Sequence, residues 1–323
     1  MPILGHYFIT NRCNARCSFC SIWQEQPSLM ANPDNVQRHL SELRSVGVRF
    51  VDFTGGEPLL HPDLPQFLTW AKTNKLRTTI TTNCLLYPKR AEELKGLVDF
   101  LHFSLDAASP ELHNRLRGVP CFDKVRESID LALKFGEHPD ILFTATSETY
   151  QELTALTKIA QKHHLMLIIN PMFNVNGDTP LDKNALEFLR IGSRQPYVYL
   201  NHAQYRLLTH GGNHLDNPRC RAISSTIVIS PDNYLLLPCF HHCNQKIPLG
   251  KPIKDIIASQ EYQDARQRQG RYIFCQNCTI NCYFDPSFLY RFDRYFIDSL
   301  FPKVKYSWYK YFLSRVTSRK KPV

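Results

Sequence analysis

The chain has no apolar run approaching 20 residues, although 43% of its 323 residues are hydrophobic. A membrane-spanning helix needs about 20 consecutive apolar residues, so the sequence excludes a helix of that kind. The N-terminus also lacks the pattern of a secretory signal peptide. We therefore expect a cytoplasmic protein that buries a full core, with enough length for one large domain and one small domain.

Evidence for a disulfide framework is also missing. The chain has eleven cysteines, an odd number, and nothing in it directs the protein to an oxidising compartment. Reduced cysteines in such numbers are more typical of metal binding than of disulfide pairing. We therefore expect the thiols to bind metal.

Positive charge is scarce outside one region. Residues 286–323 hold nine Lys or Arg against two Asp, so they carry +7 of the formal net charge of +10. The remainder of the chain is left with about +3. This balance excludes a broad nucleic-acid-binding surface on the body of the protein, and we regard nucleic acid as an unlikely partner.

Three cysteines near the start, Cys13, Cys17 and Cys20, have the spacing CxxxCxxC, and Phe19 precedes the last of them. They follow an apolar run at 4–9, so the loop leaves the end of a predicted strand. Three thiolates on one short loop can hold three irons of a 4Fe-4S cluster and leave the fourth iron open to a ligand. A zinc knuckle or reduced structural thiols are the alternatives.

Strand-like apolar runs alternate with stretches of helical periodicity over the first half of the chain. The predicted strands are 4–9, 49–53, 76–81, 100–105, 141–146 and 166–170. The predicted helices are 34–46, 62–73, 88–97, 122–135 and 149–163. Such alternation requires parallel strands with right-handed crossovers. We predict an α/β fold, a partial (β/α)6 barrel whose ligands bind at the C-terminal ends of the strands.

A second motif follows the second predicted strand and reads Thr54-Gly55-Gly56-Glu57-Pro58. Two glycines remove Cβ atoms where backbone approaches a ligand, and the proline fixes the turn. With CxxxCxxC one β/α unit earlier, residues 1–175 resemble the radical S-adenosylmethionine (SAM) enzymes. The resemblance implies a 4Fe-4S cluster on Cys13, Cys17 and Cys20, SAM on its open iron, and an external electron donor of the flavodoxin or ferredoxin type.

The resemblance also implies which residues contact SAM. The turn carbonyls and Glu57 would face the ammonium group, and polar side chains at later strand ends would bond the ribose or the carboxylate. Arg117 would pair with the carboxylate, although an exposed helix-end salt bridge is its alternative. The full predicted set is Gly55, Gly56, Glu57, Pro58, Asn83, Ser104, Asp106, Arg117 and Asn170. Relatives often have Gly where this chain has Cys84, which we interpret as a buried apolar residue or as a redox group facing the cavity.

A second group of cysteines lies far downstream. It surrounds a predicted β-hairpin with a turn at Pro231-Asp232-Asn233, followed by a helix-like stretch at 253–268 and a CxxC pair. This order resembles the SPASM or twitch extension of radical SAM enzymes, which implies one auxiliary 4Fe-4S cluster. We assign its ligands as Cys220, Cys239, Cys275 and Cys278.

Other assignments of the downstream cysteines remain open. Cys243 and Cys282 are surplus and stay without a role, as do His241 and His242 between the cysteines. A zinc ribbon would use Cys239, Cys243, Cys275 and Cys278 instead. An auxiliary cluster with only three protein ligands would bind substrate at its own open iron.

The basic segment 286–323 also contains eleven aromatic residues. We predict one amphipathic helix, a break at Phe301-Pro302, and a second helix. The apolar faces are Phe288, Leu289, Phe292, Tyr295, Phe296 and Leu300, then Val304, Trp308, Tyr311 and Phe312. The segment could dock peripherally on an anionic inner membrane face, pack on the barrel with a disordered end at 317–323, or bind RNA.

The sequence therefore predicts a four-part chain: a radical SAM core at 1–175, a bridging or substrate segment at 176–219, a small cysteine-rich α+β auxiliary domain at 220–285, and the basic aromatic tail. The predicted reaction removes hydrogen from an unidentified substrate, a peptide or a lipid-associated molecule, with the auxiliary cluster assisting oxidation or bond formation. No residue is identified as a catalytic acid or base. The competing hypothesis is a non-catalytic zinc-binding module whose tail binds nucleic acid.

Overall fold

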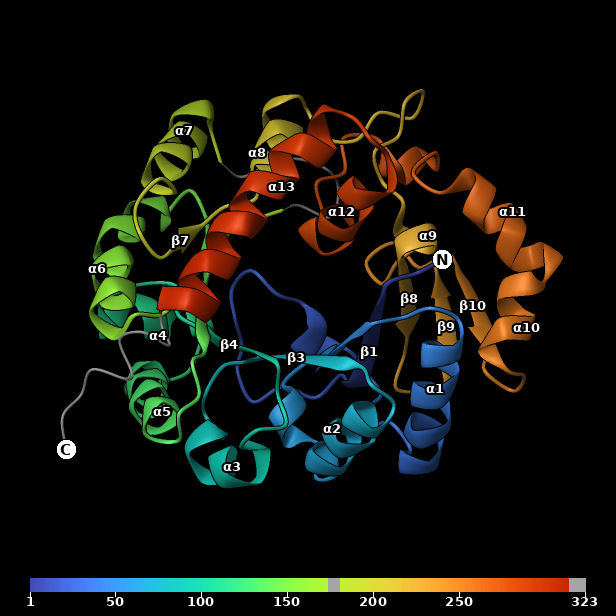
Figure 1. The fold of residues 1–323 in the computed structure, drawn as a ribbon, viewed down its shortest axis with the longest axis horizontal. Coiled ribbons are helices and arrows are strands. Elements are labelled where there is room, and N and C mark those ends of the chain that lie inside the picture. Colours follow the sequence, from blue (N-terminus) through green and yellow to red (C-terminus); the bar gives the residue numbers. More distant parts are fainter. Residues whose placement is uncertain (174–180, 314–323) are drawn as a thin grey trace.

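A computed structural model of the chain describes residues 1–173 and 181–313 (Figure 1). Its centre is one ten-stranded sheet with the order β10-β9-β8-β1-β2-β3-β4-β5-β6-β7. The pairs from β8 through β1 to β7 are parallel, and only β8-β9 and β9-β10 are antiparallel. The strands are β1 (Leu4–Thr10), β2 (Phe50–Gly55), β3 (Arg77–Thr82), β4 (Phe100–Ser104), β5 (Asp140–Ala145), β6 (Leu167–Pro171), β7 (Val198–Tyr199), β8 (Thr226–Ile229), β9 (Tyr234–Leu237) and β10 (Gln245–Pro248).

Most of the α-helices ring the outside of the curved sheet, whereas α12 and α13 lie over the end of the barrel (Figure 1). The α-helices of the described chain are α1 (Pro33–Ser45), α2 (Leu64–Thr73), α3 (Tyr87–Leu94), α4 (Pro110–Arg117), α5 (Phe122–Lys134), α6 (Leu153–His163), α7 (Lys183–Gly192), α8 (His202–Thr209), α9 (Ala222–Ser225), α10 (Ile253–Ala258), α11 (Gln260–Arg268), α12 (Asn281–Ser287) and α13 (Arg294–Ser307). The predicted α/β fold with a parallel sheet is confirmed, and each of the six predicted strands matches an observed one.

Local sequence explains why these helices begin where they do. The Asn32 side chain accepts hydrogen bonds from the backbone N–H groups of Asp34 and Asn35, so it caps α1, and Pro33 occupies the first turn. Val36 and Leu40 then lie on the buried face of the helix. The 3-10 turn η2 (Pro58–Leu60) is capped in the same way by the side chain of Glu57.

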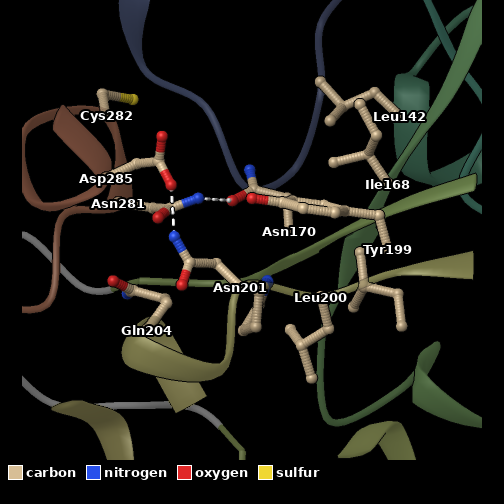
Figure 2. Close-up of a pocket in the computed structure, with 12 residues that line it drawn as sticks. Leu142, Ile168, Asn170, Tyr199, Leu200, Asn201, Gln204, Asn281, Cys282 and Asp285 are labelled. Atoms are coloured by element: carbon tan, nitrogen blue, oxygen red, sulfur yellow. Dashed lines mark hydrogen bonds between the residues drawn. The ribbon is translucent and has the colours of Figure 1, made fainter. Parts of the chain in front are cut away.

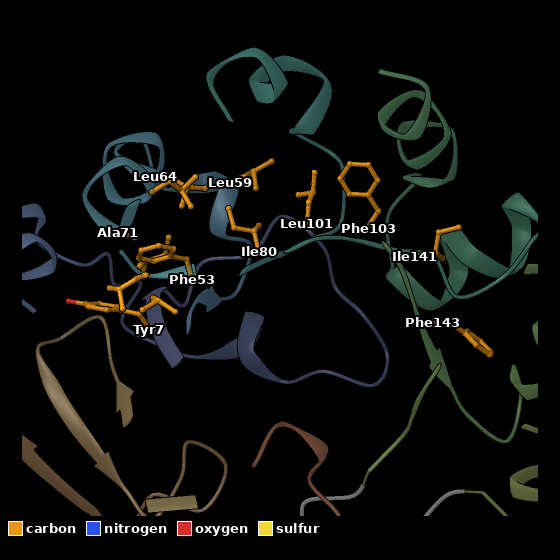
Figure 3. Packing of buried hydrophobic residues seen from close by; sticks show 14 of the residues in the cluster. Tyr7, Phe53, Leu59, Leu64, Ala71, Ile80, Leu101, Phe103, Ile141 and Phe143 are labelled. Carbon is orange, nitrogen blue, oxygen red and sulfur yellow. The ribbon is translucent and has the colours of Figure 1, made fainter. Parts of the chain in front are cut away.

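The main hydrophobic core lies between the sheet and the outer helices (Figure 3). Alternate strand residues such as Tyr7, Phe53 and Phe103 point outward into it and are at most 2% exposed. Because side chains alternate along a strand, their neighbours point to the inside of the barrel. Polar residues such as His6 and Asp52 occupy that inner face and hydrogen-bond each other. The inner face of the sheet therefore carries polar side chains at β1 and β2.

The downstream hairpin extends this same sheet. β8 pairs in parallel with β1, from Leu4 opposite Thr226 to Tyr7 opposite Ile229. Asn233 adopts a φ of 66° in the hairpin turn, as expected for an Asn in place of Gly. The cysteine-rich segment therefore shares its sheet with the core and does not form a sheet of its own.

Two elements differ from the sequence prediction. The stretch predicted as one helix at 253–268 is two helices, because Ser259 is extended and its side chain caps α11. The two-residue strand β7 lies in the segment predicted only as a bridge. A strand that short leaves no periodic pattern in the sequence.

The predicted helix break at Phe301-Pro302 is wrong. Pro302 lies inside α13, which continues directly into a π-helix at Trp308–Leu313. The helix crosses the barrel end where the strands begin (Figure 1). An ion pair of Asp298 with Arg206 holds it before the proline, and two lysines hold it after the proline. Lys303 Nζ lies 2.7 Å from Asp285 Oδ1, and Lys305 Nζ donates to three carbonyl oxygens of residues 193–198.

Packing on the barrel is thus observed for the described part of the tail. The basic residues Arg315, Arg319, Lys320 and Lys321, and the predicted disordered end at 317–323, lie outside the described residues. In the part of the chain that the structure covers, no helix combines the length and the apolar character needed to cross a bilayer.

Candidate functional site

The loop that carries the first three cysteines follows β1 at the C-terminal end of the sheet. Burial raises the pKa of Cys13 to about 11, with smaller contributions from Cys17 and Cys20, and burial also raises the pKa of Cys20, with a smaller contribution from Cys17. Backbone N–H groups of Arg16 and Ser18 donate to carbonyl oxygens of α4 at 3.0 and 2.9 Å. Three neighbouring thiols on a loop fixed by a helix fit the ligand set of an iron-sulfur cluster.

The two glycines after β2 allow the turn to pack on this loop. Gly55 has a φ of 131°, and a Cβ there would lie 1.8 Å from the carbonyl oxygen of Thr10. A Cβ on Gly56 would lie 2.1 Å from the carbonyl oxygen of Arg12. Both contacts are with the backbone that leads to Cys13. In this structure the glycines thus serve the cysteine loop, a role that the sequence did not indicate.

Glu57 ties the turn to the end of β3. Its carboxylate accepts hydrogen bonds from Thr82 Oγ1 at 2.8 Å, from the Asn83 backbone N–H at 2.9 Å and from the Leu59 backbone N–H at 3.1 Å. The side chain is buried, and burial raises its pKa to about 7. Asn83 Nδ2 in turn donates to Asn14 Oδ1 of the cysteine loop at 2.8 Å. Glu57 therefore has protein partners on both carboxylate oxygens.

Asp106 and Arg117 form a buried ion pair beneath the cysteine loop. Arg117 Nη2 lies 2.6 Å from Asp106 Oδ2, and Arg117 Nη1 lies 3.8 Å from the Cys17 sulfur. The Phe19 ring lies 5.4 Å from the guanidinium carbon. Asp106 Oδ1 accepts from the Thr144 backbone N–H at 2.9 Å. Arg117 is therefore buried against the cysteine loop and is not the exposed helix-end arginine of the alternative interpretation.

The remaining predicted SAM contacts lie at strand ends on the same side of the barrel. Ser104 ends β4 and is buried, and Pro58 begins the capped turn. Asn170 lies in β6, where its Oδ1 accepts from Asn281 Nδ2 at 3.0 Å. Cys84 is fully buried in the main core with a φ of 67°, which agrees with its interpretation as a packed apolar residue.

The downstream cysteines separate into two groups. Cys220, Cys239, Cys275 and Cys278 all line one small enclosed cavity, together with Tyr283 and Phe284. Burial raises the pKa of Cys239 to about 12 and that of Cys275 to about 11, and in each case a neighbouring thiol adds to the shift. Four thiols around one hollow fit a second cluster.

The surplus cysteines lie elsewhere. The Cys243 sulfur donates to the Gln245 carbonyl oxygen at 3.4 Å and does not line the cavity of the four thiols. Cys220 takes the place that the zinc-ribbon alternative gave to Cys243. Among the described residues, no group of three or more His, Cys, Asp or Glu side chains is arranged to hold a single metal ion.

A larger cavity of about 250 Å³ lies inside the barrel between β6 and α12 (Figure 2). Carboxamide side chains dominate its polar wall, and no described residue that lines it is Lys or Arg. The lining residues are Leu142, Ile168, Ile169, Asn170, Pro171, Tyr199, Leu200, Asn201, Gln204, Asn281, Cys282 and Asp285. Sequence reasoning missed most of these because they come from five separate elements and form no motif.

Two features of this cavity bear on its chemistry. Gln204 is 1% exposed, and its Oε1 has no hydrogen-bond partner, so an acceptor is available to a bound molecule. Cys282 lines the same cavity and its side chain is exposed. Asp285 already accepts hydrogen bonds from Asn201 and Lys303. The cavity therefore presents a spare acceptor and neutral polar groups, beside one carboxylate that is paired with Lys303.

Residues 7–160 match the model of the radical SAM superfamily. The chain is 28% identical over 159 residues to a probable GTP 3',8-cyclase of Methanococcus maripaludis, covering 48% of this chain and 54% of that protein. It is 28% identical over 166 residues to an AdoMet-dependent heme synthase of Methanosarcina barkeri, covering 50% of this chain and 48% of that protein. The match spans about half the length of these relatives.

Solved structures resemble more of the chain. SuiB of Streptococcus suis bound to its precursor peptide SuiA superposes with a TM-score of 0.70 at 20% identity, covering 86% of this chain and 70% of that chain. Native anSMEcpe with bound AdoMet superposes with a TM-score of 0.66 at 15% identity, covering 99% of this chain and 100% of that chain. At these identities the likeness concerns the fold.

Proposed function

We propose that this chain, a member of the radical SAM superfamily, is an enzyme that uses a 4Fe-4S cluster on Cys13, Cys17 and Cys20 to start radical chemistry on an organic substrate. When bound, the cluster and SAM supply a 5'-deoxyadenosyl radical that abstracts hydrogen. The observation that carries the proposal is that three neighbouring thiols lie on one loop that α4 and the glycine turn hold in place.

The protein's own contribution is to position SAM and substrate and to exclude water. Backbone carbonyls of the Gly55–Gly56 turn, with Asn83, Ser104 and Asn170, are our proposed SAM contacts. Glu57, Asp106 and Arg117 have protein partners, so we assign them to holding the turn and the cysteine loop. An external flavodoxin or ferredoxin type donor would supply the electron.

Cys220, Cys239, Cys275 and Cys278 would hold the auxiliary cluster. When bound, that cluster offers an electron acceptor for substrate oxidation or bond formation. The chain runs from Cys278 directly into α12, which forms one wall of the 250 Å³ cavity. This connection supports the cavity as the place where substrate lies between the two cysteine groups.

The cavity favours an uncharged substrate portion that donates hydrogen bonds, such as a peptide main chain or the neutral part of a lipid-linked molecule. Its described walls offer amide oxygens and no cation for a phosphate. GTP, the substrate in the name of several relatives, carries a triphosphate that needs cations. We therefore expect added GTP to leave SAM cleavage unchanged.

Anaerobic reconstitution tests the function directly. The purified chain should bind about eight irons and eight sulfides, as two 4Fe-4S clusters require. With dithionite as reductant it should then convert SAM to 5'-deoxyadenosine and methionine. Bound zinc, no brown colour and no cleavage would instead support the zinc-binding module.

Two matched substitutions separate the proposed auxiliary ligands from the surplus thiol. Cys220→Ser should reduce the iron content to about four per chain, because it removes one of four ligands to the second cluster. Cys243→Ser, its control in the same segment, should keep about eight. The ligand assignment would be overturned if the two variants lost iron in the reverse order.

Docking on an anionic membrane is a second proposal, for which the outer face of α13 is the reason. Phe301 and Val304 of α13, and Trp308 and Phe312 of the π-helix that continues it, are 55–71% exposed. The basic residues that follow in the sequence could add attraction to anionic lipid.

The liposome experiment should use surface substitutions, since removing the tail would uncover the barrel. The double variant Phe301→Ser, Trp308→Ser should sediment with phosphatidylserine vesicles at least several-fold less than the parent chain. Ile273→Ser, which removes an 89% exposed side chain on another face, should sediment like the parent. Equal recovery of all three in the supernatant would rule out membrane docking.

A further inference from the structure

The sequence suggested that Arg117 binds the SAM carboxylate, but the structure gives this side chain another neighbour. Its guanidinium is buried with one nitrogen 3.8 Å from the Cys17 sulfur and another 2.6 Å from Asp106. The Phe19 ring also covers the guanidinium, with its centroid 5.4 Å from the guanidinium carbon. A permanent cation thus contacts one of the three proposed cluster ligands.

Only one member of the Asp106–Arg117 ion pair contacts the Cys17 thiol. Arg117 contacts the Cys17 sulfur, whereas Asp106 lies behind the guanidinium and accepts the Thr144 backbone N–H with its other oxygen. The side chain of Asp106 is fully buried and that of Arg117 is 9% exposed, so water screens their charges little. The local field at Cys17 is therefore set by a near positive charge and a more distant negative one.

From this geometry we infer that Arg117 raises the reduction potential of the N-terminal cluster and that Asp106 limits the increase. The inference rests on the proposed function, because it concerns a cluster bound by Cys17. Reduction adds one negative charge to a cluster, and a hydrogen-bonding cation at a ligand sulfur stabilises that charge. Arg117 is a positioning and tuning residue here, since it acts through the cysteine ligand.

The two charges predict opposite effects. Arg117→Met removes the cation and should make reduction at least tenfold less favourable, a shift of about 59 mV to lower potential for a one-electron couple. Asp106→Asn keeps a polar acceptor for Thr144 but removes the opposing charge, so it should shift the potential upward. The double variant should lie between the two single variants.

A redox titration of the reconstituted full chain, followed by electron paramagnetic resonance, measures these shifts. The auxiliary cluster in the same sample serves as the internal reference, and addition of SAM identifies the N-terminal signal. Arg115→Met is the matched control, because Arg115 is on the same helix but pairs with Glu148 at the surface. The Arg115→Met variant loses the same charge but should leave the reduction potential of the N-terminal cluster unchanged.

The outcomes separate this inference from the proposed function. If the parent chain assembles no N-terminal cluster, the proposed function fails. If clusters assemble and Arg117→Met changes only their amount, with the potential equal to that of Arg115→Met, Arg117 is merely structural and the inference is overturned. Shifts of the same sign for Arg117→Met and Asp106→Asn would also overturn it.

Discussion

Replacing Gly55 with alanine should reduce the iron content of the reconstituted chain from about eight to about four per molecule, because only the N-terminal cluster should be lost. The new methyl group would lie 1.8 Å from the carbonyl oxygen of Thr10, far inside van der Waals contact. Alanine is also strained at the φ of 131° that this position requires. The cysteine loop would have to move, and with it Cys13.

The remaining iron makes this result interpretable. The proposed auxiliary cluster lies on different elements, so its four irons would report that the variant has folded. Gly250→Ala is the matched control, since no atom lies within 4 Å of a Cβ at Gly250, and it should keep about eight irons. A Gly55→Ala chain with a full iron content and normal SAM cleavage would contradict the role that we give to this glycine.

The sequence predicted the parts of the fold that depend on local patterns. Six strands were found because alternating apolar runs and helical periodicity are visible within short windows. Asn233 has the positive φ that a hairpin turn requires, and Asn is one of the residues that tolerate it. The order of these elements then made the parallel sheet and the side on which the cysteine loop lies predictable.

Features that depend on contacts distant in sequence were not predictable. The neighbour of Arg117 is 100 residues away along the chain, and no spacing rule joins it to Cys17. The cavity wall brings Asn170 together with Asn281, which are 111 residues apart. Pro302 reads as a helix breaker by local rules, but tertiary contacts of Lys303 and Lys305 hold it inside a continuous helix.

The same tertiary contacts predict a large effect at the other end of the barrel. Asp140 begins β5, is fully buried, and is surrounded by Lys310, Tyr306 and His102. Lys310 Nζ lies 2.5 Å from Asp140 Oδ1, and Tyr306 donates its hydroxyl to Oδ2 at 2.7 Å. Burial alone would raise the pKa of Asp140, but Lys310 and His102 outweigh it and hold the pKa below its usual value.

Lys310→Met should therefore lower the free energy of unfolding by about 3 kcal/mol at pH 7, because it leaves a buried carboxylate without its cation. The loss should appear in thermal unfolding as a melting temperature several degrees below that of the parent. Lys251→Met removes an exposed lysine and should cost less than about 0.5 kcal/mol. Lys310→Met combined with Asp140→Asn should recover part of the loss, since no buried charge then lacks a partner.

The pH dependence of stability is an independent test of the interaction between Asp140 and Lys310. In the parent, the folded pKa of Asp140 is depressed, so its contribution is complete above the unfolded value of about 3.9 and is lost only as the pH falls below it. In Lys310→Met, Asp140 stays buried without the lysine, so its pKa in the folded state rises. As the pH falls, protonation of Asp140 removes the unpaired buried charge and the variant regains stability. The melting-temperature deficit should therefore shrink between pH 7 and about pH 4. A deficit that stays constant over this range, or a variant as stable as Lys251→Met, would mean that the Asp140–Lys310 pair does not fasten the tail to the barrel.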